Sequence, residues 1–217
     1  MLLTPGPTPV PEFVRKAMAD ITIHHRTEEF EAIFKNTREL LIELYDMPEV
    51  VMLASSGTGA MEACVTNLTH KKALTINSGK FGERFGKICA AFGIDYTEIK
   101  NEWNTPVSVE AVINAIKADS SIDAVFIQIC ESAGGLRHPV EEIAAEIKKI
   151  NKDITIVADG ITAVGVEKID TTNLDAVVTG SQKALMLPPG LAMIGFSNAA
   201  VAKIESKPRG YYFNLAI

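Results

Sequence analysis

The stretch Ala176–Ser197, AVVTGSQKALMLPPGLAMIGFS, holds two short apolar runs separated by a polar turn. Ala176–Val178 and Leu191–Phe196 have the length and composition of buried strands. Pro188-Pro189-Gly190 breaks regular structure between them. The stretch therefore predicts a strand, a turn and a second strand, with one amine, that of Lys183, in the turn.

Lys183 is in an unusual place for a charge. Lysine is rarely fully buried without a partner, and burial lowers its pKa by disfavouring the ammonium form. A neutral amine is what a Schiff-base nucleophile requires. The alternative is a loop lysine whose stem covers apolar surface while its amine reaches water. Other parts of the sequence are needed to distinguish a nucleophilic lysine from an ordinary loop lysine.

Composition places the chain among ordinary globular proteins. Of its 217 residues 47% are hydrophobic and 22% are charged, and the net charge is −6. An acidic chain is a poor nucleic-acid binder, since phosphate contacts need a basic surface. No apolar stretch approaches the ~18 residues of a membrane span, and the N-terminus lacks the pattern of a secretion signal. We expect a cytoplasmic α/β protein that binds neither nucleic acid nor membrane.

The cysteines and histidines give no sign of a disulfide framework or a metal site. They are Cys64, Cys89, Cys130, His24, His25, His70 and His138. Their spacing matches no metal-binding pattern. Because all three cysteines lie in apolar surroundings, we expect buried, reduced thiols and no bound metal.

Apolar runs and helical patterns alternate along most of the chain. Helices are expected near 12–19, 27–46, 60–63, 81–92, 109–118 and 140–150, and strands near 50–53, 73–76, 95–99, 124–129, 154–158, 176–178 and 191–196. Thr27 and Ser108 are expected N-caps. Continuous apolar strands are typical of a parallel sheet covered on both faces. The proline-rich residues 4–11 predict an extended arm that crosses the surface or passes close to a ligand.

Polar residues follow several of these strands directly. Ser56-Gly57-Thr58 follows the first, Glu131-Ser132 the strand at 124–129, Asp159 the strand at 154–158, and Lys183 the run at 176–178. Ligands of open α/β sheets bind at the carboxyl ends of the strands. A composite site at that edge is therefore expected.

The turn Ser56-Gly57-Thr58-Gly59 joins a strand to a helix. This arrangement points backbone N–H groups and the helix dipole at an anion. The sequence is neither a P-loop nor a dinucleotide fingerprint. A turn that only caps its helix is equally compatible with these residues.

Asp159 and Lys183 together suit pyridoxal phosphate. That cofactor needs a lysine, a carboxylate for its pyridine nitrogen, an anion site and a flat side chain against its ring. A lysine released from the cofactor can then move a proton as general base and acid. Phe81 is the candidate flat group, although by itself it is equally an ordinary core residue.

Six motifs in the same order resemble the class V aminotransferases, and most closely the alanine–glyoxylate and serine–pyruvate enzymes. They are Pro5-Gly6-Pro7-Thr8, Ser56–Ala63, Gly79–Arg84, Glu131-Ser132, Val157-Ala158-Asp159 and Gly180–Ala184. The resemblance implies a three-layer α/β/α fold with a mostly parallel central sheet, the large domain of the pyridoxal-phosphate-dependent transferases. It also implies transfer of an amino group from a small amino acid, alanine or serine, to a 2-oxo acid, glyoxylate or pyruvate.

The resemblance also implies a role for each matching residue. Lys183 would carry the cofactor as an internal aldimine, and Asp159 would bind the pyridine nitrogen. Phe81 and Ile161 would lie against opposite faces of the ring, with Ser132 near its phenolic oxygen. The remaining implied contacts are Ser56, Gly57, Thr58 and Gln182 on the phosphate, and Gly6 in the substrate pocket.

Two departures from the family pattern stand out. Glu131-Ser132-Ala133-Gly134-Gly135 replaces the family's Glu-Ser-Ser/Thr-Thr-Gly. The family's members are also considerably longer, so we expect the small C-terminal domain to be missing. The expected organisation is an arm and short helix at 1–26 and a cofactor-binding large domain at 27–217. The family implies a homodimer for the intact protein.

Three alternatives remain open from the sequence. One is a cysteine desulfurase or another lyase of the same fold, although all three cysteines precede Lys183. Another is a non-catalytic module that binds a phosphate ligand through Ser56–Thr58. The third is a dimerisation or folding unit that binds nothing.

Overall fold

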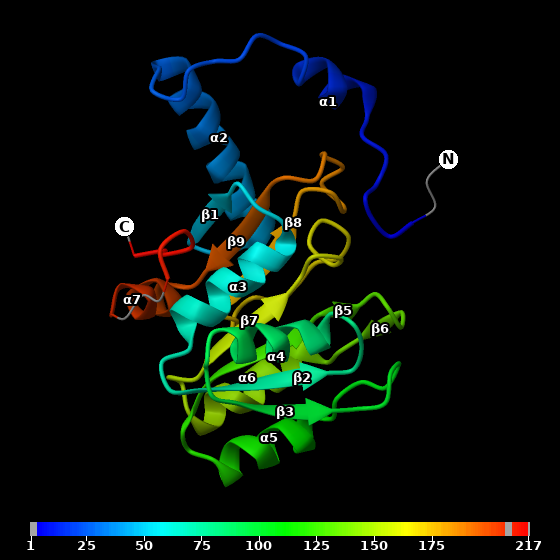
Figure 1. Ribbon diagram of the computed structural model, residues 1–217, viewed down its shortest axis with the longest axis vertical. Helices are drawn as coiled ribbons and strands as arrows, with labels where there is room; N and C mark the ends of the chain where they lie inside the picture. Colours follow the sequence, from blue (N-terminus) through cyan, green and yellow to red (C-terminus); the bar gives the residue numbers. More distant parts are fainter. Residues whose placement is uncertain (1–3, 207–209, 217) are drawn as a thin grey trace.

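A seven-stranded sheet forms the centre of the molecule in the computed structural model, which describes residues 4–206 and 210–216 (Figure 1). The strand order is β1-β9-β8-β7-β4-β2-β3. Its strands are β1 (Glu49–Leu53), β2 (Lys72–Asn77), β3 (Tyr96–Lys100), β4 (Ile122–Gln128), β7 (Thr155–Asp159), β8 (Ala176–Gly180) and β9 (Ala192–Phe196). Strand β9 is antiparallel to both β8 and β1, so the other six point the same way.

Helices cover both faces of this sheet (Figure 1). They are α2 (Glu28–Tyr45), α3 (Gly57–Leu68), α4 (Gly82–Ala91), α5 (Val109–Ala118), α6 (Val140–Ile150) and α7 (Asn198–Ser206). The short helix α1 (Glu12–Ala17) buries no residue and belongs to neither layer. Helices α2, α5 and α6 pack into one apolar cluster with the sheet. Helices α3, α4 and α7 pack into a second cluster on the opposite face. The expected three-layer α/β/α fold with a mostly parallel sheet is confirmed.

The expected caps are present where the sequence places them. Thr27 Oγ1 accepts a hydrogen bond from the Phe30 N–H at 3.3 Å, and Ser108 Oγ accepts one from the Ala111 N–H at 3.1 Å. Each cap satisfies a backbone donor that the first helical turn leaves free.

Two features were not expected from the sequence. A small hairpin pairs β5 (Cys130–Glu131) with β6 (Leu136–Arg137), and helix α7 follows β9. Two-residue strands are too short to show any periodicity, and α7 begins in a run of small residues that carries little pattern.

A hydrogen-bonded turn closes the loop that carries Lys183. The Ser181 N–H donates to the Leu191 carbonyl at 2.9 Å. Ser181 Oγ donates to the Pro188 carbonyl at 2.6 Å and accepts from the Leu191 N–H at 3.3 Å. Since Ser181 is buried, these bonds fix the loop between β8 and β9 at its base.

No helix among the described residues has both the length and the apolarity needed to cross a bilayer.

The clearest stability prediction concerns a buried ion pair at the amino ends of the strands. Asp175 lies 2.6 Å from Lys148 Nζ and also accepts from the Ile156 N–H at 2.8 Å and from Ser197 Oγ at 3.0 Å. Asp175→Asn leaves the Lys148 ammonium without its counter-charge, and the expected loss is about 3 kcal/mol of unfolding free energy. Urea unfolding measures it.

The control for that experiment is Glu12→Gln, which breaks the exposed Lys16–Glu12 pair, whose side chains are 76% and 71% accessible. Exposed pairs contribute little, so this variant should unfold like the wild type. Equal effects of the two substitutions would contradict the importance of burial at Asp175.

Candidate functional site

One small pocket at the carboxyl ends of β7 and β8 gathers most of the residues predicted to hold a cofactor ring. It is lined by Phe81, Cys130, Ser132, Asp159, Ile161, Thr162 and Lys183. All of these except Cys130 and Thr162 were predicted from the sequence. They converge because parallel strands deliver the residues that follow them to one edge of the sheet.

Asp159, the last residue of β7, is 4% exposed. Its Oδ1 accepts a hydrogen bond from the Ile161 N–H at 3.0 Å. Burial raises the pKa of its carboxyl to about 6, while that hydrogen bond and the charges of Arg84 and Lys183 act in the opposite direction. A cationic ligand that entered the pocket would stabilise the ionised form of this carboxyl and lower its pKa.

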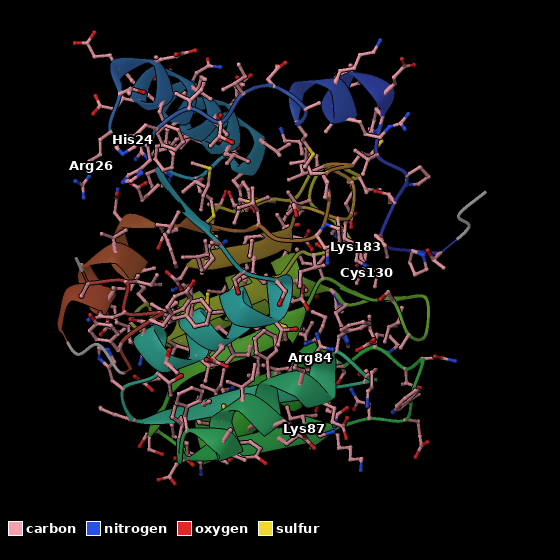
Figure 2. The ribbon with its side chains drawn as sticks, turned by 45° about the horizontal axis from the view of Figure 1, so that its top comes forward. His24, Arg26, Arg84, Lys87, Cys130 and Lys183 are labelled. Carbon is pink, nitrogen blue, oxygen red and sulfur yellow. The ribbon has the colours of Figure 1, made fainter. Side chains whose placement is uncertain are left out.

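Lys183 lies three residues beyond the end of β8 and is half-buried. Burial lowers the pKa of its amine, and the negative charge of Asp159 opposes part of that shift. The amine is therefore easier to deprotonate than an exposed lysine, as a nucleophilic lysine requires. Figure 2 shows Lys183 beside Cys130, which lines the same pocket.

The N-terminal arm contacts the loop that carries Lys183. The Thr8 N–H donates to the Gln182 carbonyl at 3.0 Å, and Thr8 Oγ1 donates to the Lys183 carbonyl at 2.8 Å. A Cβ on Gly6 would lie 2.6 Å from Lys183 Cδ and 2.7 Å from its Nζ. Gly6 therefore gives the backbone its close approach to the amine.

Helix α3 begins at the predicted anion turn. Ser56 is its N-cap and is exposed, and its side chain makes no capping hydrogen bond. The N–H groups of the first turn have no partners within the helix. A Cβ on Gly57 would lie 2.4 Å from Ile161 Cδ1, so the helix start packs directly on the residue that follows the Asp159 turn.

Arg84 connects the anion turn to the pocket. Its Nη1 donates to Thr58 Oγ1 at 2.8 Å, and its guanidinium lies 4.8 Å from the centre of the Phe81 ring. It also lowers the pKa of Asp159 through its charge. Figure 2 shows Arg84 among the side chains of α4.

Glu131 positions Phe81, a role that the sequence did not reveal. Its buried carboxylate accepts the N–H groups of Phe81 and Gly82 at 2.9 Å each, and that of Ala133 at 3.1 Å. A Cβ on Gly79 would lie 2.6 Å from Glu131 Cγ. Gly79 and Glu131 together therefore fix the start of α4 and the position of the Phe81 ring.

Glu131→Gln should lower the free energy of unfolding by about 2 kcal/mol, because an amide has only one acceptor oxygen and cannot accept from all three N–H groups. Urea unfolding measures the loss. Glu83→Gln, in the first turn of α4 with 38% of its side chain accessible, is the matched control and should change stability far less. A Glu131→Gln chain as stable as the wild type would show that the three hydrogen bonds are replaceable.

Gln182 does not line the pocket. Its Oε1 is buried with no hydrogen-bond partner in the described part of the chain, and it would lie 2.7 Å from a Cβ on Gly180. The side chain thus folds back over the end of β8.

The expectation of three buried thiols is wrong for Cys130. Cys64 and Cys89 are buried, but Cys130 is only partly so, and all three are free. Cys130 begins the hairpin strand β5, which leaves the sheet at the pocket. Of the apolar neighbours that suggested burial, Ile127 belongs to β4 and Ile129 follows it directly, and both are fully buried.

Pocket volume and pocket chemistry point to different places in the molecule. The pocket around Lys183 encloses only about 20 Å³. A hollow of about 680 Å³ lies between α2 and the segment 164–171, but none of the predicted site residues lines it. The candidate site is therefore the pocket where the amine and the perturbed carboxylate converge.

Known proteins of similar sequence and structure include aminotransferases. The family described as "Aminotransferase class-V" matches residues 2–212. An "Uncharacterized aminotransferase" of Helicobacter pylori (strain J99) is 50% identical over 99% of this chain and 58% of its own length. The L-aspartate–glyoxylate aminotransferase of Paracoccus denitrificans is 30% identical over 97% of this chain and 56% of its own.

A solved structure gives the same result. The aspartate aminotransferase of subgroup IV from Thermus thermophilus superposes with a TM-score of 0.89 at 33% identity, covering 98% of this chain and 60% of that one. The chain spans less than two thirds of the length of these relatives. With the family match running through nearly all of its residues, the chain belongs to the class-V aminotransferase family.

Proposed function

We propose that this chain carries the cofactor site of a pyridoxal-phosphate-dependent aminotransferase. The observation that carries the proposal is the convergence of Lys183 and Asp159 on one pocket. The amine is biased toward its neutral form by burial, and the carboxyl is held in a place where a cation would stabilise its charge. A structural lysine–aspartate ion pair would not need Phe81, Ser132 and Ile161 around it.

The residues present fit pyridoxal phosphate. Ser56, Gly57 and Thr58 supply a hydroxyl and free N–H groups at the start of a twelve-residue helix, which suits a phosphate. Gly57 leaves no room for a Cβ beside Ile161, so the start of α3 packs against a residue proposed to contact the ring. Gln182, the remaining phosphate contact that the resemblance implies, would have to turn from its position over Gly180 to donate to that phosphate from its amide nitrogen.

Bound there, the cofactor would supply an electron-withdrawing ring that stabilises negative charge at the Cα of an amino acid. Asp159 would hold a proton on the ring nitrogen by its charge. Lys183 would first bind the cofactor and then move a proton at the substrate Cα. Phe81 and Ile161 would supply flat and apolar surface, and Ser132 would donate near the ring.

The substrates we propose are alanine or serine as donor and glyoxylate or pyruvate as acceptor. Support comes from the family and from the Paracoccus relative, whose name gives glyoxylate as its oxo acid. The same name gives aspartate as the amino acid, so aspartate belongs in the test beside alanine and serine.

We also propose a homodimer in the reducing cytoplasm, with residues 1–26 serving as an arm and 27–217 as the cofactor-binding domain. Helix α2 supports the dimer, since it exposes an apolar set made of Ile33, Phe34, Leu40 and Leu44. Exposed apolar patches of this kind mark interaction surfaces. The three free thiols fit a reducing compartment.

The test is amino transfer to the cofactor itself. Purified chain is mixed with pyridoxal phosphate, and alanine, serine or aspartate is added in turn. The expected result is a change in the cofactor's absorbance together with one equivalent of the matching 2-oxo acid. Formation of a coloured complex that no amino acid alters, with no oxo acid released, would contradict an aminotransferase.

Gly6→Ala tests the arm over the lysine. The added methyl group would meet Lys183 Cδ, Nζ and Cε at 2.6–2.8 Å, so the amine or the arm has to move. Covalent capture of pyridoxal phosphate should slow about tenfold, measured by stopped-flow absorbance. Stability should hardly change, because the end of a lysine side chain is flexible.

The control for this experiment is Pro9→Ala, an exposed position in the same arm, and it should leave the capture rate unchanged. An unaltered rate in Gly6→Ala would show that the arm does not affect the reaction of the Lys183 amine with the cofactor.

A further inference from the structure

Gln128 is a buried amide whose hydrogen-bonding groups go unused. It ends β4 and is 0% exposed, and neither Nε2 nor Oε1 has a hydrogen-bond partner within the described residues. An unpaired buried amide is costly, whereas an apolar side chain of the same size would not be. The amide therefore needs a hydrogen-bond partner that it does not contact in this structure.

Strand register places Gln128 directly beside Asp159. Gln128 and Asp159 are paired positions of the parallel strands β4 and β7, about 4.8 Å apart across the ladder. Paired residues of a sheet point to the same face. Phe126 and Val157, two residues earlier on each strand, both lie in the apolar cluster under α3 and α4.

The start of α4 covers the amide from above. A Cβ on Gly82 would lie 3.0 Å from Gln128 Oε1 and 2.6 Å from the Ile76 carbonyl. Water therefore has little access from that side, while β7, the strand on the other side of β4 from β2, carries Asp159. The amide has two N–H donors, and an ionised carboxylate accepts about four hydrogen bonds.

We propose that Gln128 is a positioning residue that donates from Nε2 to the Asp159 carboxylate whenever that carboxylate is ionised. The inference rests on the proposed function, in which Asp159 must be charged and correctly oriented toward a pyridine nitrogen. A donor to the charged form favours ionisation. Gln128 would thus counteract the burial that disfavours it.

Three charged groups already act on Asp159, and the test has to hold them constant. Arg84 and Lys183 favour the ionised carboxylate, and Glu131 disfavours it. Gln128→Met removes the amide with little change of volume and leaves all three in place. Gln128→Leu is a second variant of the same kind. Thr75→Val is the matched control, since Thr75 is equally buried with an unpartnered Oγ1 on the neighbouring strand β2.

The first measurement is a carboxyl NMR titration of Asp159 in the cofactor-free chain. Gln128→Met and Gln128→Leu are expected to raise the pKa of Asp159 by about one unit, whereas Thr75→Val should leave it unchanged. Well below pH 6, where the Asp159 carboxyl is neutral, thermal unfolding of both variants should be at least as resistant as in the wild type, since the amide is then unpaired. An unchanged pKa in a folded Gln128 variant overturns the proposal.

The second measurement is the dissociation constant of pyridoxal phosphate. Gln128→Met should weaken binding about tenfold when Asp159 is present and should have no effect in an Asp159→Asn background, because it acts through that carboxylate. An equal loss in both backgrounds overturns the proposal. If the wild-type chain forms no borohydride-sensitive band, the proposed function fails, and the titration alone still decides the Gln128 contact.

Discussion

Lys183→Ala is expected to abolish covalent capture of pyridoxal phosphate and to lower the rate of amino transfer about 10⁴-fold. Alanine lacks the amine that binds the cofactor and moves the proton, and acid–base catalysis of this kind contributes up to about 10⁴-fold. Absorbance titration with pyridoxal phosphate measures the first effect, and single-turnover formation of the 2-oxo acid measures the second.

The control has to separate loss of the amine from loss of a surface charge. Lys80→Ala removes an exposed lysine close to Phe81, with 59% of its side chain accessible. It should bind pyridoxal phosphate as the wild type does. A Lys183→Ala chain that still gives a borohydride-sensitive band would mean that another amine carries the cofactor.

Asp159→Asn should have the second largest effect. The amide keeps the size of the side chain but loses the charge, and a hydrogen bond to a charged group contributes about 1.5–3 kcal/mol. Cofactor affinity should therefore fall about 10- to 100-fold, and amino transfer should fall further because the ring nitrogen loses its proton.

The affinity for pyridoxal phosphate should also depend on pH through the Asp159 carboxyl. In the cofactor-free chain burial raises the pKa of Asp159 to about 6. Below that pH the carboxyl is neutral, so wild-type affinity should decline as the pH falls through 6. Asp159→Asn should lack that decline. Parallel profiles for the two proteins would remove Asp159 from the pyridine nitrogen.

Stability should move in the opposite direction to affinity. A carboxyl whose pKa rises from 3.8 to about 6 on folding stabilises the fold below pH 3.8, and that contribution is lost as the pH rises through 6. At pH 7 its charge then disfavours folding by up to about 3 kcal/mol. The cofactor-free Asp159→Asn chain should accordingly be more stable than the wild type at pH 7 and equally stable near pH 3.5.

Much of the fold was predictable from hydrophobic patterning. Continuous apolar runs such as 124–129 are typical of strands in a mostly parallel sheet between two helical layers, where both faces of a strand are buried. The convergence of Asp159 and Lys183 was predictable for the same reason, because parallel strands end at one edge.

Contacts that depend on side-chain direction were out of reach. Glu131 could be read as one more polar residue after a strand, and only the fold shows its carboxylate holding the start of α4. Thr8 lies 175 residues from Lys183, yet its hydroxyl binds the Lys183 carbonyl. Cys130 was predicted to be buried and is only partly so, because strand β4 ends one residue earlier than the apolar pattern does.

The most direct test of the account is to locate the cofactor chemically. The chain is incubated with pyridoxal phosphate, reduced with borohydride, digested and analysed by mass spectrometry. The expected result is one reduced cofactor per chain, on Lys183. Modification spread over exposed lysines, or none at Lys183, would contradict it.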